Sequence, residues 1–305
     1  MSYPNGAQTS YAYDAGGKIS QILHQRISDQ SALWFTNYYY DPAGNRTSIT
    51  DADGSHTFTY DDLHWLTAAS HGPTSVLPNK AETFAHDKVG NRTSDALRTG
   101  YAYDAANILL SDSKYTYTTD AEGNTTSRTE RATSEKTYYD HDSGGRMVRV
   151  RNASGTVAEY KYNLAGDRSE KVVGPTTYRY VHDDRRVLAI LDGNNNLVAL
   201  FTNGPRIDSP FIMRRNGADY FYHADALGNI NALTDTNGNA VETVAYQAYG
   251  KPAVRDALGI IHEQSTVGNA FLYSSREYDG ETGLYYLRAR YYGADVGRFY
   301  EEDPI

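Results

Sequence analysis

Hydrophobic and polar side chains alternate over short stretches along most of the chain. The segments "YTYTT" (115–119) and "YKYN" (160–163) are typical, with a tyrosine at every second position. Because the side chains of a strand point alternately to its two faces, this pattern predicts strands with one packed and one solvated face. Tyr and Thr also favour strands. Helical periodicity is weak, and only residues 256–264 are compatible with one or two helical turns. We therefore predict an all-β fold.

A short polar motif separates the alternating stretches and recurs every 16 to 26 residues. It consists of an aromatic residue or Thr, then Asp or Asn, a short gap, and Gly or Asn. Asp followed by Gly-Asn supplies positive backbone angles and side-chain hydrogen bonds for a tight reversal. The chain is thus expected to be a ribbon of hairpins whose tyrosine rings stack across strands. The copies begin at Tyr40, Tyr60, His86, Tyr103, Thr119, Tyr139, Tyr162 and His182.

The composition argues against several classes of protein. The chain has 305 residues, a formal net charge of -9 and no cluster of basic residues, which disfavours binding to nucleic-acid phosphates. It has no cysteine, so disulfides and thiolate metal sites are excluded. The longest apolar runs hold about five residues, too few for a membrane-spanning helix. We expect no cofactor. The first residues lack the apolar core of a classical secretory signal, so we expect export by another route or a place in a larger protein.

The last third of the chain is more specific than the repeats. It contains "YFYHADALGNINALTDTNGNAVETVAYQAYG" (220–250), then "FLYSSREYDGETGLYYLRARYYGADVGRF" (271–299), and then Asp-Pro. This order resembles the RHS-associated core region, and the repeats resemble the YD repeat of the RHS (rearrangement hotspot) family. That family includes the C components of insecticidal Tc toxins and, more distantly, teneurins. The resemblance implies a YD-repeat shell segment over 1–205 and the core region over 206–305.

The family resemblance also implies a function. A YD-repeat hairpin ribbon spirals into a hollow shell with an irregular C-terminal plug, and the shell encapsulates a C-terminal toxin polypeptide until it is delivered. The expected partners are that cargo and the upstream shell or delivery components. The expected location is the bacterial cytoplasm before export by a secretion system. About eight repeats are too few to close such a shell, so we expect open strand edges and self-association.

Candidate chemistry lies near the C-terminus. In relatives that cleave themselves, carboxylates near the pattern RYYDPxxGRFxxxDPxG act as an aspartyl-type pair, with one carboxyl neutral and one charged. The resemblance assigns Asp303 to the Asp-Pro element and Arg290 and Arg298 to the basic positions. Gly293 stands where the family pattern has Asp, and Asp295 lies two places later. We therefore expect Gly293→Asp to recover cleavage if cleavage is absent.

A structural interpretation of the same stretch stays open. Three arginines could simply pair with nearby carboxylates to hold the segment together. The residues concerned are Arg288, Arg290 and Arg298 on one side and Glu301, Glu302 and Asp303 on the other.

Several other motifs are best interpreted as turns or framework. Ser143 in "HDSGG", with His71 upstream, resembles part of a serine protease site, but this spacing does not promise the required geometry. The remaining candidates are calcium loops at Asp51, Asp53 and 235–239, glycosylation sequons at Asn45, Asn91, Asn124 and Asn152, and a general-base pair of His223 and Asp225.

Three functional hypotheses follow from these patterns. The leading one is a structural shell segment of an RHS-type toxin. The second is an aspartyl-type autoprotease that separates shell from toxin. The third is a cell-surface adhesin or carbohydrate binder, since exposed tyrosines suit stacking on sugars.

Overall fold

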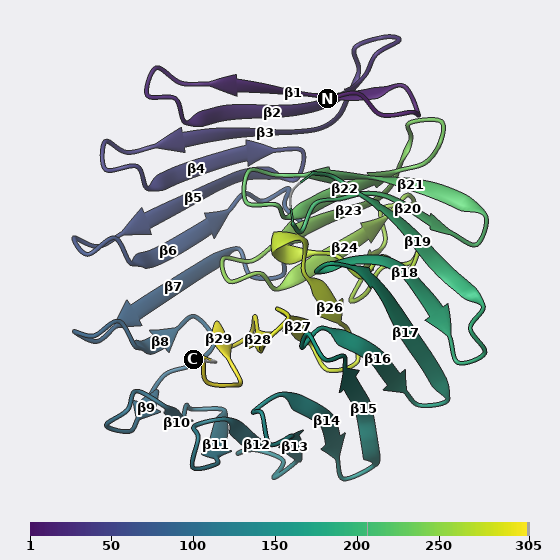
Figure 1. Cartoon of the computed structure of the whole chain (residues 1–305). Coiled ribbons are helices and arrows are strands. Elements are labelled where there is room, and N and C mark those ends of the chain that lie inside the picture. The colour runs from purple at the N-terminus through teal and green to yellow at the C-terminus, as the bar shows by residue number, and fades with distance from the viewer. Residues whose placement is uncertain (206, 304–305) are drawn as a thin grey trace. The chain divides into compact units, whose positions relative to one another are not determined.

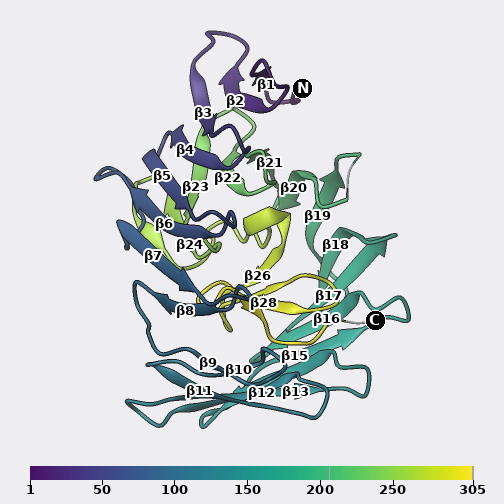
Figure 2. The same cartoon turned by 90° about the vertical axis from the view of Figure 1, so that its left-hand side faces the viewer.

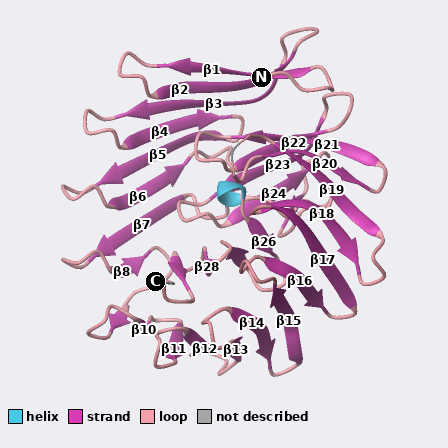
Figure 3. Cartoon of the chain, viewed as in Figure 1, coloured by secondary structure: helices cyan, strands magenta, loops and turns pink. Residues whose placement is uncertain are grey.

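Strands make up nearly all of the regular structure in the computed structural model, which describes residues 1–205 and 207–303. Strands hold 54% of the residues and helix 1%, which confirms the predicted all-β fold. Figure 3 shows a single helical turn in the described part of the chain, η1 (Tyr273–Ser275). Residues 256–264, which are compatible with one or two helical turns, form none. The Asp256 carboxylate accepts the backbone N–H groups of Leu258 and Ile260 and forms a tight turn there instead.

The chain divides into two compact units, each built from separate stretches of sequence. The first unit comprises residues 1–82 and 199–276, and the second comprises 83–198 and 277–305. The two units are defined by which residues lie close together, not by where the sequence repeats begin and end. The predicted division of the sequence at residue 205 therefore stays a prediction.

The first unit contains two antiparallel meanders in which each strand pairs with the next along the chain. In Figure 1 the strands β1 to β6 follow one another as successive rungs. The strands are β1 (Ala7–Tyr13), β2 (Ile19–Arg26), β3 (Ala32–Tyr40), β4 (Arg46–Asp51), β5 (Gly54–Tyr60), β6 (Leu66–His71), β19 (Leu197–Asn203), β20 (Pro210–Arg215), β21 (Ala218–Ala224), β22 (Ile230–Thr234), β23 (Ala240–Tyr246), β24 (Pro252–Asp256) and β25 (Ile261–His262).

The second unit repeats this meander and adds a small C-terminal sheet of four strands. Figure 2 shows the C-terminal strands, in yellow, beside β16 and β17. The strands are β7 (Ala81–His86), which begins in the first unit, β8 (Arg92–Asp95), β9 (Ala102–Tyr103), β10 (Leu109–Ser111), β11 (Tyr115–Thr119), β12 (Thr125–Glu130), β13 (Lys136–His141), β14 (Met147–Asn152), β15 (Gly155–Tyr162), β16 (Arg168–Val173), β17 (Thr176–Asp183), β18 (Arg186–Asp192), β26 (Glu277–Asp279), β27 (Leu284–Tyr286), β28 (Tyr291–Gly293) and β29 (Arg298–Phe299).

The repeated turns are held by the side chain of their first residue. In the turn that follows β3, Asp41 Oδ1 accepts the backbone N–H of Asn45 at 2.8 Å. Its Oδ2 accepts a hydrogen bond from the side-chain amide of Asn45. Gly44 adopts a φ of 96°, which a residue with a Cβ rarely does. The same carboxylate or amide bond to the fourth following N–H recurs at Asp14, Asp61, Asp87, Asp104, Asp120, Asp142, Asn163, Asp192, Asp225, Asp235 and Asp256. The aspartate of the repeat therefore fixes the reversal.

The tyrosine that precedes the turn links two turns to each other. Tyr40 ends β3, and its hydroxyl donates to the carbonyl of Ile19, the first residue of β2, at 2.9 Å. The same bond joins the end of one strand to the start of the strand before it at Tyr60–Arg46, Tyr103–Arg92, Tyr162–Met147 and Tyr246–Ile230. Tyr and Asp of the repeat thus serve two tasks, because Asp shapes one turn and Tyr ties that turn to the previous one.

Candidate functional site

Two of the predicted site residues meet at the C-terminus. Arg290 Nη2 lies 3.4 Å from Asp303 Oδ1, and the guanidinium covers the Phe299 ring at 3.7 Å from its centre. The side chain of Asp303 is 77% exposed, so this ion pair lies largely in water and adds little to folding. The proline of the predicted Asp-Pro element lies outside the described residues.

Asp295, the third predicted residue, is paired with different arginines. Its Oδ2 lies 3.0 Å from Arg128 Nη1 and 3.9 Å from Arg98 Nη1. Arg128 also donates to the hydroxyl of Tyr300 at 3.2 Å, so these contacts hold the C-terminal segment on β12. The two candidate carboxylates therefore belong to two separate ion pairs.

The expected network of three arginines and three carboxylates forms only in part. Arg290 does pair with Asp303, but Arg298 turns to the backbone carbonyl of Asn107 at 2.8 Å and to the Tyr103 ring. Glu301 accepts the backbone N–H of Tyr291 at 2.7 Å. The C-terminal segment is thus held mainly by contacts with the repeat region and by hydrogen bonds to its own backbone.

Glu301 is a functional candidate that the sequence did not reveal. Burial raises the pKa of this carboxyl to about 8, so it holds its proton at neutral pH. Its Oε1 lies 3.9 Å from Nε2 of His141, and burial lowers the pKa of that imidazole. Glu301 Oε1 and both ring nitrogens of His141 are buried without a hydrogen-bond partner among the described residues. A neutral carboxyl therefore lies two residues before Asp303.

Arg168 is the centre of the second unit and was also not foreseen. It is fully buried, and its Nη2 lies 2.7 Å from Glu277 Oε2 while Nη1 pairs with Asp279. Lys171 reaches the same Asp279 at 2.7 Å. Burial alone would raise the pKa of Asp279, but Arg168 and Lys171 hold it below its ordinary value.

Tyrosines surround this buried arginine. The Arg168 guanidinium lies over the rings of Tyr160, Tyr180 and Tyr286 at 5.4, 5.0 and 4.5 Å from their centres. The Tyr286 hydroxyl accepts the backbone N–H of Arg168 at 2.8 Å. The tyrosines of "YLRARYY" therefore pack with the repeat tyrosines around one charged centre, as the ring contact of Tyr160 with Tyr291 at 4.9 Å also shows.

Arginine follows the turn at one fixed position of several repeats, which is the signal that could have pointed to Arg168. Arg46, Arg92 and Arg168 each begin a strand. Their guanidinium groups lie over the rings of Tyr38, Phe84 and Tyr160 at 4.6, 5.1 and 5.4 Å. The sequence could have shown this recurrence, but not which arginine becomes buried among carboxylates.

The motifs interpreted as turns or framework lie in turns or in the buried interior. Ser143 is an exposed turn residue after Asp142, and His71 is bound to His56 and Glu82. His223 is fully buried between His24 and Thr234. The sequon residues Asn45, Asn91 and Asn124 donate to their turn aspartates, and Asn152 accepts the backbone N–H of Ser154.

The stretch around Asp51 and Asp53, considered as a calcium loop and interpreted as a turn, is held by hydrogen bonds and an ion pair. Asp51 Oδ1 accepts the backbone N–H groups of Asp53 and Gly54, and Asp53 pairs with Arg255 at 3.0 Å. In residues 1–205 and 207–303 no three His, Asp or Glu side chains gather as metal ligands would. The same residues contain no helix long and apolar enough to cross a membrane.

Comparison with known proteins places the repeats and the C-terminal region in one class, the YD-repeat shell proteins. Residues 73–304 match the Teneurin YD-shell family, and residues 40–74 match the RHS Repeat. The chain therefore belongs to the Teneurin YD-shell family, which confirms the resemblance seen in the sequence.

Individual relatives include toxin proteins of bacteria. The chain is 30% identical over 292 residues to the tRNA3(Ser)-specific nuclease WapA of Bacillus spizizenii, which covers 94% of this chain and 10% of that protein. It is 26% identical to the double-stranded DNA deaminase toxin A of Burkholderia cenocepacia, over 90% of this chain and 21% of that protein. The chain thus spans only a small part of these relatives.

A solved structure supports the same fold. The crystal structure of TcdB2-TccC3 matches 99% of this chain and 18% of that chain with a TM-score of 0.61. The sequence identity is 18%, so this likeness concerns the fold. The ribbon of hairpins described above is therefore the YD-shell fold found in Tc toxin components.

Proposed function

We propose that this chain is a section of the wall of a toxin shell, which encloses a toxin polypeptide joined to its C-terminal side. In this proposal residues 1–205 form the repeat wall and 206–305 the core region. The observation that carries it is the match of residues 73–304 to the YD-shell family. The double-stranded DNA deaminase toxin among the relatives supports a cargo of that kind.

The position of the C-terminal segment supports the proposal. Strand β26 is anchored through Glu277 and Asp279 on the buried Arg168, and Tyr286 of β27 bonds the same residue. A polypeptide that continues beyond such an anchored segment starts from a fixed place on the wall. We further propose that the protein leaves its bacterial cell through a secretion system, together with upstream shell or delivery components.

Protease protection tests the enclosing role. The natural gene product, with any sequence that precedes or follows this chain, is treated with a nonspecific protease under native conditions. We expect the downstream polypeptide to be protected and to become degradable once the shell is unfolded in urea. Rapid degradation of that polypeptide while the repeats remain intact would contradict the proposal.

Self-cleavage next to Asp303 is a second candidate function, favoured by the neutral carboxyl of Glu301 close to it in the chain. An aspartyl-type reaction needs one protonated and one ionised carboxyl, and burial supplies the protonated member at Glu301. Arg290 lies 3.4 Å from Asp303. Asp295 is engaged by Arg128, so its part in this reaction stays a prediction.

The cleavage proposal is tested in the same natural gene product. We expect Asp303→Asn to abolish the appearance of a separate downstream fragment, since an amide cannot take up a proton. Arg290→Ala should slow it, and Asp295→Asn should leave it unchanged if Asp295 only anchors the segment. Undiminished cleavage in Asp303→Asn would rule out this mechanism.

The structure changes the expectation for Gly293. A Cβ at this position would lie 2.7 Å from Cε2 of the buried Tyr300 and 3.1 Å from Val296 Cγ2. Gly293→Asp therefore forces Tyr300 to move, and we expect it to disturb the packing of β28 rather than to restore cleavage.

A further inference from the structure

Two buried histidines of the first unit face each other where its two stretches of sequence meet. His24 lies on β2 and His223 on β21, and Nδ1 of one ring lies 3.2 Å from Nδ1 of the other. The two residues are 2% and 0% exposed, respectively. Neither has a part in the proposed shell or cleavage functions.

The hydrogen bonds around the pair fix which ring nitrogens carry a proton when both rings are neutral. Nε2 of His24 lies 3.3 Å from the carbonyl oxygen of Ala224, which can only accept, so this nitrogen donates. Nδ1 of His24 therefore accepts, from the hydroxyl of Thr9 at 2.7 Å and from Nδ1 of His223. Nε2 of His223 then accepts from the hydroxyl of Thr234 at 2.9 Å. All four ring nitrogens are thus satisfied without a positive charge.

The surroundings of the pair offer nothing that would stabilise an added proton. Among the described residues no carboxylate forms an ion pair with either ring. The Tyr3 ring lies 5.0 Å from that of His223, and burial raises the pKa of its phenol to about 12, so it stays neutral. The carboxyl of Asp225, in the turn after β21, is bound to Asn229. The residues paired with the two histidines on neighbouring strands do not titrate; they are Thr9, Trp34 and Ala232.

Burial therefore lowers the pKa of both imidazoles. The pKa of His24 falls from 6.5 to about 4, and that of His223 falls well below 6.5. If β2 leaves β21, both rings enter water and take up protons at their ordinary pKa. Between pH 6.5 and about 4 the detached state thus binds protons that the closed state does not bind. The closed state therefore loses stability as pH falls through this window.

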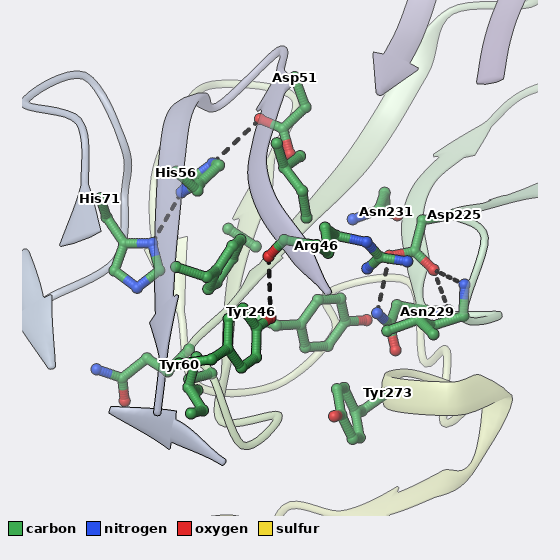
Figure 4. A pocket seen from close by; sticks show the side chains of 17 residues that line it. Arg46, Asp51, His56, Tyr60, His71, Asp225, Asn229, Asn231, Tyr246 and Tyr273 are labelled. Carbon is green, nitrogen blue, oxygen red and sulfur yellow. Dashed lines mark hydrogen bonds and ion pairs between the residues drawn. The ribbon is translucent and has the colours of Figure 1, made fainter. Parts of the chain in front are cut away.

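A second pair of buried histidines in the same unit has different partners. Nδ1 of His56 lies 2.8 Å from Nδ1 of His71. However, Nε2 of His56 lies 3.3 Å from Asp51, and Nε2 of His71 lies 2.9 Å from Glu82. Figure 4 shows His56 between Asp51 and His71, at one side of a pocket of about 200 Å3 that Arg46 also lines. A proton added to this pair has a carboxylate at either end, whereas one added to the first pair has none.

The first pair lies where strands can separate. Strand β1 is at the end of its sheet and pairs with β2. Besides His24, the Tyr3 hydroxyl joins this end to β21, because it donates to the carbonyl of Tyr222 at 3.0 Å. A proton on Nδ1 of His24 would turn its bond with His223 into a contact between two N–H groups.

We propose that His24 and His223 form an acid-sensitive latch, which holds β1 and β2 against β21 and β22 at neutral pH and releases them in mildly acidic solution. The detached strands are stabilised by the protons that the two imidazoles take up. The latch depends on contacts within the first unit, so it stands or falls independently of the shell and cleavage proposals.

Hydrogen–deuterium exchange with mass spectrometry, on the full natural gene product, tests the latch. Exchange rates at about pH 7 and about pH 4.5 are each divided by the intrinsic rate at that pH. His24 alone should lower the protection of residues 7–26 about fiftyfold between these pH values, and His223 should add to this loss. Residues 54–71, which contain the second pair, should change much less. Because exchange is resolved by peptide, the opposite pH dependence expected from Glu301 in the second unit does not interfere.

Variants assign the loss to the two imidazoles. In the double variant His24→Gln and His223→Gln we expect the protection of residues 7–26 to be nearly equal at the two pH values, whatever its absolute level. His64→Gln, at an exposed position of the same unit, is the matched control and should keep the wild-type loss. Should the double variant not fold, NMR of the wild-type imidazole Cε1–H groups decides, since both buried rings should still be neutral at about pH 5.5 in the closed state.

Four results would overturn the proposal. One is that the protection of residues 7–26 does not change with pH. Another is that the acid-dependent loss persists in the double variant. The third is that both imidazoles titrate with ordinary pKa values while the strands stay protected. The fourth is an equal loss in residues 54–71, which would show general acid unfolding.

Discussion

Arg168 and Arg46 occupy the same position of the repeat, one in each unit, but their surroundings differ. Each begins a strand after a turn, and each guanidinium lies over the ring of a tyrosine on the strand before, Tyr160 at 5.4 Å and Tyr38 at 4.6 Å. Arg168 is then enclosed by Glu277 and Asp279. Arg46 instead borders a pocket and leaves its Nε without a partner among the described residues.

This difference shows how one repeat can serve two purposes. Where the C-terminal segment brings carboxylates to the arginine, the position becomes a buried structural centre. Where no described carboxylate comes within 4.0 Å of the arginine, as at Arg46, the same position lines a pocket of the first unit. The repeat therefore supplies the cation and the ring, and segments distant in sequence decide their role.

The strongest test of the comparison is to replace each arginine by methionine. Arg168→Met leaves Asp279 and Glu277 buried with fewer partners, and we expect the free energy of unfolding to fall by about 3–5 kcal/mol. Arg46→Met should cost about 1 kcal/mol, since it removes mainly a ring contact. Urea unfolding at neutral pH measures both, and equal losses would show that the two positions do not differ.

A variant of Glu301 tests whether the second unit contains a buried carboxyl that stays protonated at neutral pH. Its pKa is raised from 4.5 to about 8 in the folded protein, so between these values the unfolded chain releases a proton that the folded chain keeps. The folded state therefore loses stability as pH rises through this window, by up to about 1.4 kcal/mol per pH unit.

We expect Glu301→Gln to abolish most of this pH dependence and to be more stable than wild type near pH 8. The two proteins should have similar stability at pH 4.5, where the carboxyl is protonated in the folded state. Urea unfolding across this pH range is the measurement. A wild-type protein whose stability does not fall between these pH values would refute the buried neutral carboxyl.

Gln247 tests the opposite property, an unsatisfied buried group in the first unit. Because its buried Nε2 has no partner among the described residues, Gln247→Leu should raise the free energy of unfolding by about 1 kcal/mol. Gln264→Leu, at an exposed position, should change it by less than about 0.5 kcal/mol. A clear destabilisation by Gln247→Leu would mean that the amide has a structural partner.

The last test concerns the hydroxyl bond that both units share. Tyr40→Phe in the first unit and Tyr103→Phe in the second each remove a hydroxyl that donates to a backbone carbonyl, at 2.9 and 2.7 Å. We expect a loss of about 1 kcal/mol in each. The adjacent Tyr39, which is 55% exposed, provides the control, and Tyr39→Phe should be neutral.

Local patterns predicted the strands and the turns, because these depend on neighbours in the chain. The Asp41 turn follows from Asp, Gly and Asn at fixed spacing. The same chemistry at Asp256 left a helical turn open, since an Asp-Ala-Leu-Gly sequence suits both.

The candidate sites depended on distant contacts and were less accessible to sequence reasoning. Glu301 becomes neutral because burial removes its carboxyl from water, and Arg168 finds carboxylates that lie 109 and 111 residues away. Nothing in the local sequence around either residue carries that information. Conversely, the arginine that sequence reasoning chose, Arg290, is bound to the exposed Asp303.

The hydroxyl bond of Tyr40 joins residues 21 apart, whereas the bonds of Arg168 to the C-terminal strands span more than 100. Contacts between near neighbours form early in folding, and distant ones form late. We therefore expect the hairpins to assemble one after another while the chain leaves the ribosome. Arg168 then lacks its carboxylates until residues 277–279 have been synthesised, so the second unit can be completed only after that stretch has left the ribosome.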